Sequence, residues 1–165
     1  MTHTVARTNV DDQDRVHPRR GMIRQLAFWS LVALTGFNAL SAIAGGIAVL
    51  MTNGLGMPTS MLASGPFASF AWPGALLAVV VGGSHVLAGG LLIARREVAL
   101  LWAAVAGFVM LVWIFVETMM IGEGSFLQVL YFATGGAEII LVLALLGIVA
   151  WLPRQPMRGA RTAGL

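Results

Sequence analysis

Apolar residues along the chain gather in four long runs, separated by shorter stretches that hold nearly all of the charge. The runs cover residues 26–51, 74–94, 98–121 and 127–152. A helix needs about 20 consecutive apolar residues to cross the hydrocarbon core of a bilayer, and each run meets that length. Because short connections make neighbouring helices antiparallel, the pattern predicts an all-α membrane protein with four transmembrane helices in an up-and-down bundle.

The two ends of the chain are polar. Residues 1–25 and 153–165 hold too few apolar side chains to build a core, so we expect disordered tails on either side of a transmembrane domain at 26–152. A cleaved signal peptide is the competing interpretation of the first run. That run is longer than the apolar segment of a signal peptide, which has about 7–15 residues, and a polar head precedes it.

The connection at 52–73 is long and unusually apolar for a loop. It is rich in Gly, Pro, Ser and Met, and it also carries Phe67, Phe70 and Trp72. Such a segment is poorly suited to bulk water. We expect it to lie on the membrane surface or to fold over the mouth of the bundle, with a short helix at 58–62.

Composition excludes whole classes of protein. Hydrophobic residues make up 58% of the 165 residues and charged residues 10%, with a mean hydropathy of +0.87. Soluble domains carry about 25% charge, so a soluble domain is excluded. The absence of cysteine excludes disulfides, thiolate metal sites and thiol redox chemistry.

The arginines predict the orientation of the helices. Every basic residue is Arg, and all ten precede the first run, separate the second from the third, or follow the fourth. By the positive-inside rule both termini are cytoplasmic. An Arg-only chain rich in Ala, Gly and Val is typical of a bacterial protein, which predicts the bacterial inner (plasma) membrane as its location. The net charge of +3 follows from these arginines and does not indicate a nucleic-acid partner. Those at the membrane surface are predicted to contact lipid headgroups: Arg19, Arg20, Arg24, Arg95 and Arg96.

Polar residues lie at membrane depth, where an ionisable side chain costs about 2.5–3.5 kcal/mol on insertion scales. Asn38, His85 and Glu138 fall near the middle of their runs, and Glu117 falls towards the outer end of the third. If the carboxyl of Glu138 and the imidazole of His85 touch, they form a coupled pair that shares a proton. The alternative is that each residue only forms structural hydrogen bonds between helices.

Spacing of three and four residues places several polar side chains of the fourth run on one helix face. Thr35, Asn38 and Ser41 form a second such stripe on the first run. The pattern predicts a polar vestibule that opens outward and ends near the midplane. Its expected ligand-binding or proton-relay residues are Asn38, His85, Glu117, Gln128, Tyr131, Thr134 and Glu138.

Glycine pairs recur in the apolar runs, at 45–46, 82–83, 89–90 and 135–136. Small residues let helix backbones approach closely in lipid. The pairs therefore indicate tight packing within one chain or, alternatively, a face for a homo-oligomer. No metal-ligand spacing, nucleotide loop or nucleophile motif is found, so we expect neither a metal nor a cofactor, and an enzyme ranks last.

The segment MLASGPFASFAWPG at 61–74, continuing to VVGGSH at 80–85, resembles uncharacterised bacterial four-helix integral membrane proteins. The general layout is also similar to the DoxX-like group. The resemblance implies a four-helix inner-membrane bundle and no particular activity. DoxX-like proteins often carry a carboxylate in the second span, where this chain carries His85.

Three hypotheses for function follow from these features. The leading one is a protein that binds a lipid-like or quinone-like ligand in an outward-facing intramembrane pocket, as an accessory subunit of a membrane protein partner. The second is a proton-coupled transporter acting as a homodimer, in which Glu117 and Glu138 relay protons. The third is a structural assembly factor.

Overall fold

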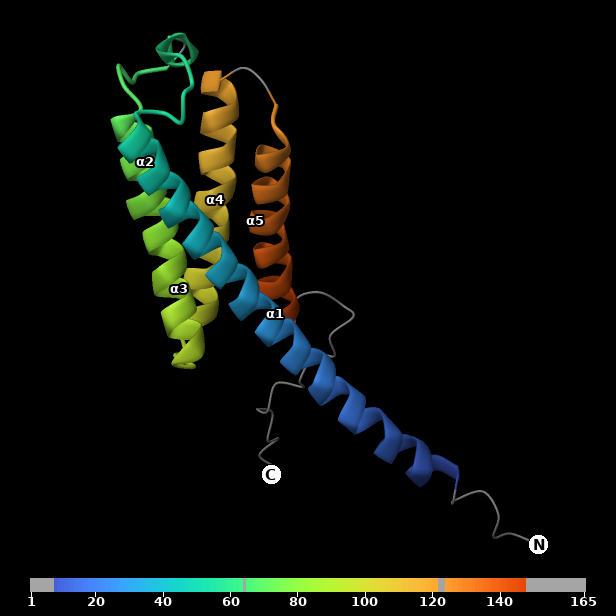
Figure 1. Ribbon diagram of the computed structural model, residues 1–165. Helices are drawn as coiled ribbons and strands as arrows, with labels where there is room; N and C mark the ends of the chain where they lie inside the picture. Colours follow the sequence, from blue (N-terminus) through green and yellow to red (C-terminus); the bar gives the residue numbers. More distant parts are fainter. Residues whose placement is uncertain (1–7, 64, 122–123, 148–165) are drawn as a thin grey trace, which may run out of the picture.

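Every regular element of the described chain is helical. The computed structural model describes residues 8–63, 65–121 and 124–147. Four helical spans are long and apolar enough to cross a membrane: Gly21–Thr52, Ala71–Ile93, Ala99–Met120 and Phe126–Leu145. The prediction of an all-helical chain with four such helices is therefore confirmed, and Figure 1 shows them side by side.

The second span is not one uniform helix. The element order is α1 (Thr8–Thr52), η1 (Thr59–Leu62), α2 (Ala71–Leu76), η2 (Leu77–Gly82), α3 (Gly83–Ile93), α4 (Ala99–Ile121) and α5 (Phe126–Leu145). The short helix η1 has 3-10 geometry, whereas η2 is a π-helix that joins α2 to α3. The second span and α5 each pack against both α1 and α4, so the spans close into a four-membered ring (Figure 1).

Two helix ends differ from the sequence prediction. The first helix begins at Thr8, so the described part of 1–25 is helical and not a disordered tail. This extension propagates an existing helix and needs no new nucleus. At the other end, α5 stops at Leu145 instead of continuing to 152, because Gly147 adopts a φ of 73° that no α-helix accommodates. Residues 148–165, which include the predicted tail 153–165, lie outside the described residues.

The two ends of the bundle differ in character. We call the end with Arg95 and Arg96, between α3 and α4, the arginine end, and the opposite end the loop end. The connection from α1 to α2 lies at the loop end, where η1 packs against α4 (Figure 1). Leu62 and Phe70 of this connection are buried, and the Phe70 ring lies directly against Gly54. Part of the apolar character of the loop is thus used in packing within the chain.

Glycines form the closest helix contacts within the chain. A Cβ added at Gly46 would lie 2.6 Å from the backbone of α2 and η2, and one at Gly82 would lie 2.5 Å from Ile43 of α1. Gly107 and Gly135 bring α4 and α5 together in the same way. By contrast, a Cβ at Gly136 would meet nothing within 4 Å. Packing within the chain therefore accounts for one member of the pair at 135–136, and a homo-oligomer stays a prediction.

Candidate functional site

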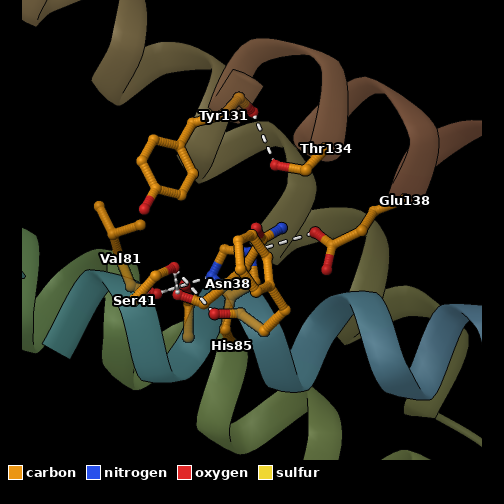
Figure 2. Close-up of polar contacts among 9 residues, drawn as sticks. Asn38, Ser41, Val81, His85, Tyr131, Thr134 and Glu138 are labelled. Atoms are coloured by element: carbon orange, nitrogen blue, oxygen red, sulfur yellow. Dashed lines mark hydrogen bonds and ion pairs between the residues drawn. The ribbon is translucent and has the colours of Figure 1, made fainter. Parts of the chain in front are cut away.

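His85 and Glu138, which are 53 residues apart in sequence, meet in the interior of the bundle. The Nε2 atom of His85 on α3 lies 3.1 Å from the Oε2 atom of Glu138 on α5, and both side chains are fully buried (Figure 2). The other ring nitrogen of His85, Nδ1, lies 2.7 Å from the carbonyl oxygen of Val81 one turn earlier. Both ring nitrogens are therefore engaged, and the orientation of the imidazole is fixed.

These contacts determine how many protons the pair holds. A carbonyl oxygen only accepts hydrogen bonds, so Nδ1 of His85 must carry a proton that it donates to Val81. The short contact on the other side of the ring then needs one further proton between Nε2 and the Glu138 carboxylate. Whether that proton resides on nitrogen or on oxygen, the pair as a whole is neutral. A neutral pair avoids the cost of an isolated charge in lipid.

The neighbouring polar atoms have no partner. Among the described residues, the buried atoms without a hydrogen bond are Thr35 Oγ1, Asn38 Oδ1, Asn38 Nδ2 and Glu138 Oε1. All three side chains are 0% exposed. Figure 2 draws Asn38 on α1 in the same close-up as the contact between His85 and Glu138. We call Thr35, Asn38, His85 and Glu138 the polar cluster; it lies near the middle of three spans.

Unpaired buried polar atoms are rare, because each costs about 1–3 kcal/mol. Here the cluster offers two acceptor oxygens, one on Asn38 and one on Glu138, and the amide donor of Asn38. The Thr35 hydroxyl can either donate or accept a hydrogen bond. A bound group that carries both donors and acceptors would satisfy them. The arrangement therefore makes the polar cluster the candidate binding site of this chain.

The backbone before His85 is irregular. The π-helix η2 ends at Gly82, and His85 lies in the first turn of α3. The carbonyl of Val81, inside η2, accepts bonds from both Ser84 and His85. Single π turns inside helices occur frequently at functional sites. The irregularity thus coincides with the residue that carries the imidazole.

Apolar layers enclose the polar cluster on both sides. Towards the arginine end lies a layer of buried Leu31, Ala88, Leu92, Ala99, Ala103, Ala106 and Val142. Towards the loop end lies a second layer, formed by Ala42, Val81, Met110 and Ile114, with Trp113 and Tyr131 packed against it. The cluster is therefore closed to both ends in this conformation.

The predicted polar stripe on α5 does not form a continuous vestibule. Gln128 belongs to the capping box that starts α5, because its side chain accepts a bond from the Ser125 backbone while its own N–H donates to the Ser125 hydroxyl. The Thr134 hydroxyl donates to the carbonyl of Tyr131 in its own helix, and the ring of Tyr131 stacks on Phe37. Only Glu138 of this stripe belongs to the cluster.

Glu117 lies apart from the cluster, in a pocket of about 70 Å³ at the loop end. Among the described residues that line the pocket, this half-buried carboxylate is the only charged side chain, and it shares the lining with Trp113 and with Met57, Leu62 and Phe70 of the loop. The predicted relay from Glu117 to Glu138 is therefore interrupted by the apolar layer. Trp113 contacts both regions, since it lines the pocket and packs against that layer.

Thr35 was expected on a polar stripe of the first run and was not among the expected site residues. Its position one helical turn before Asn38 was the available signal, since residues three apart share a helix face. Of the predicted lipid-contacting arginines, Arg24, Arg95 and Arg96 line one groove; the side chains of Arg19 and Arg20 lie outside the described part. Within that part, no three His, Cys, Asp or Glu residues gather to hold a metal ion.

Comparisons with protein-family models, curated proteins and solved structures give no match to this chain. The resemblance to DoxX-like proteins accordingly stays a prediction. The geometry of the polar cluster is therefore the basis on which a function is inferred.

Proposed function

We propose that this chain is a membrane-embedded binding protein for a small amphipathic ligand, lipid-like or quinone-like, whose polar end is held by the polar cluster. One observation carries the proposal: the polar cluster combines a buried pair that shares a proton with four polar atoms that have no partner among the described residues, one of them Glu138 Oε1 of the pair itself. A ligand hydroxyl would donate to Glu138 Oε1 and accept from the amide nitrogen of Asn38, whereas a ligand carbonyl would accept from that amide nitrogen. The apolar layers would surround the apolar body of the same ligand.

In this proposal the ligand enters from the loop end. The pocket beneath the loop leads to Trp113, and Trp113 packs against the apolar layer above the cluster. Entry would displace Met110 and Trp113 of that layer, and methionine is among the most adaptable of apolar side chains. Glu117 would then meet the polar end of the ligand during entry.

The same geometry favours binding over proton-coupled transport. A carrier must expose its site to each side of the membrane in turn, so both apolar layers would have to open. The layer towards the arginine end contains seven buried residues from all four spans, and it has no polar side chain. We therefore place the access route at one end only.

The proposal includes the orientation predicted from the arginines. With the arginine end in the cytoplasm, the loop end and its pocket face the outside of the bacterial inner membrane. The ligand would then come from the outer leaflet, and a partner subunit would receive it there.

Ligand retention tests the proposal through Asn38→Leu, with Ser41→Ala as the matched control. Asn38→Leu removes two of the unpaired atoms and leaves the contact between His85 and Glu138 in place. Ser41 lies on the same helix face, but its hydroxyl donates to carbonyls of its own helix. Native mass spectrometry of protein released gently from membranes should show a small molecule on the wild type and on Ser41→Ala, and at least about tenfold less on Asn38→Leu.

Two outcomes would contradict the proposal. If the wild-type protein carries no small molecule in native mass spectrometry, the proposal that it binds a ligand is contradicted. Equal retention by wild type and Asn38→Leu would place the ligand elsewhere in the chain. Co-purification of a stoichiometric protein partner with the wild type and both variants, again without a small molecule, would favour the structural assembly factor.

A further inference from the structure

A groove at the arginine end combines cationic and apolar side chains. It encloses about 560 Å³. Arg24 comes from α1, whereas Arg95 and Arg96 come from the turn between α3 and α4. The floor of the groove contains Leu92, Leu100 and other apolar residues. Among the described side chains, the only ion pair is the one between His85 and Glu138, so these three arginines have no carboxylate partner there.

The backbone at Arg95 is unusual for a residue with a side chain. The turn after α3 is a Schellman motif, in which Arg95 N–H donates to the Leu92 carbonyl and Arg96 N–H donates to the Leu91 carbonyl. The residue in the position of Arg95 is usually glycine, because it must adopt a left-handed conformation. Arg95 adopts it with a φ of 50°. An arginine at this position costs backbone strain that a glycine would avoid.

The contacts of the Arg95 side chain indicate what offsets this strain. Its guanidinium group lies 4.9 Å from the centre of the Phe28 ring on α1, a cation–π contact that joins the turn to the helix that also carries Arg24. A strained residue held in one direction by a second helix is typical of a site that is preorganised for a ligand.

We propose that this groove binds the phosphate of an anionic phospholipid, with the guanidinium groups on the phosphate and an acyl chain along the apolar floor. Arginine binds phosphate through paired, planar hydrogen bonds. Next to the groove, Ile93 and Val98 are 69% and 48% exposed, which is appropriate for residues that face lipid. A soluble phosphate compound would use the guanidinium groups and leave the apolar floor open, so the floor favours the lipid. This site is distinct from the polar cluster and does not depend on it.

Arg95→Gly tests this proposal without endangering the fold, because glycine is the usual residue at that turn position. The probe is phosphatidylglycerol, titrated against the purified protein by native mass spectrometry, with phosphatidylcholine as the neutral lipid. Each arginine at a membrane surface contributes enough to weaken binding about fivefold when it is lost. We therefore expect about fivefold weaker binding of phosphatidylglycerol by Arg95→Gly and about 25-fold weaker binding by the double variant with Arg24→Gln, if the two contributions add. The melting temperature of Arg95→Gly should equal or exceed that of the wild type.

Arg15→Gln is the matched control. It removes the same charge from α1, about 13 Å further along the helix from Arg24, and should leave lipid affinity unchanged. Equal binding of phosphatidylglycerol by wild type and Arg95→Gly would overturn the proposal, as would an equal loss in Arg15→Gln. Displacement of the lipid by millimolar inorganic phosphate would also overturn it, since the groove would then be a site for soluble phosphate compounds.

Discussion

His85→Leu should destabilise the protein more than Glu138→Leu does, although both remove one half of the same pair. Removing His85 leaves a fully buried carboxyl group with neither oxygen paired, because Glu138 Oε1 already has no partner. Breaking a buried pair in this way costs about 3–5 kcal/mol. Removing Glu138 leaves a neutral imidazole that still donates to the Val81 carbonyl and loses only the partner of Nε2. One unpaired buried acceptor costs about 1–3 kcal/mol.

The double variant His85→Leu/Glu138→Leu completes the cycle. It replaces the whole pair with apolar side chains of similar size, which is often neutral or stabilising in other proteins. We expect its free energy of unfolding to lie close to that of the wild type and well above that of His85→Leu. Reversible unfolding in detergent, followed by circular dichroism, measures all four proteins. A larger loss in Glu138→Leu than in His85→Leu would contradict this account of which atoms each substitution leaves unpaired.

Gly46→Ala, which adds one methyl group, should strongly destabilise the bundle. We expect it to lower the free energy of unfolding by about 3 kcal/mol, in the upper part of the range for overpacked cores. The new Cβ would lie 2.6 Å from the backbone nitrogen of Ala78 and 2.6 Å from the carbonyl oxygen of Gly74. Both are backbone atoms, so α1 and the second span would have to separate. That separation would also loosen the packing of α1 against the span that carries His85.

Gly136→Ala is the control for this prediction. Nothing lies within 4 Å of a Cβ at Gly136, and alanine is favoured over glycine inside a helix by about 1 kcal/mol. The control should therefore unfold at the same temperature as the wild type or a higher one. The melting temperatures of Gly46→Ala and Gly136→Ala, measured in the same detergent, test whether the loss of stability is specific to Gly46. Similar losses in both would show that the contact at Gly46 is not specific.

The helices of this protein could be predicted from the sequence because the cost of burying charge in lipid dominates the pattern. Runs of more than 20 apolar residues have few alternatives to a membrane span, and the structure has all four. The ends were harder to predict, because they depend on local geometry. Gly147 ends α5 through a left-handed backbone. The sequence at 148–152 is apolar, so it gave no indication that the helix would end before it.

The residues of the candidate site could be predicted from the sequence, but the contacts between their side chains could not. Depth along each run placed Asn38, His85 and Glu138 at one level of the membrane, but the rotation of each helix depends on how it packs. The close approaches at Gly46 and Gly135 set that rotation. The π-helix η2 shifts the residues after it around the helix axis, and no property of the sequence LAVVVG marks it.

The outward vestibule failed as a prediction for a different reason. Polar residues on one helix face share a direction, but they need not share a cavity. Gln128 is used by the start of its own helix and Thr134 by its own backbone. Apolar Met110 and Ile114 fill the space between Glu117 and the cluster. Hydrogen bonds to the backbone of the same helix use polar side chains that would otherwise face a shared site, and sequence spacing does not reveal such bonds.

The free energy of unfolding of Asn38→Leu, measured in detergent without ligand, tests most directly whether the polar cluster is built for binding. Leucine at this position replaces an amide whose oxygen and nitrogen are both buried and unpaired. If those atoms exist to hold a ligand, the variant should be more stable than the empty wild type by about 1–3 kcal/mol, because an unsatisfied group is removed. If Asn38 instead holds the helices together, the variant will be less stable, and that result would contradict the account.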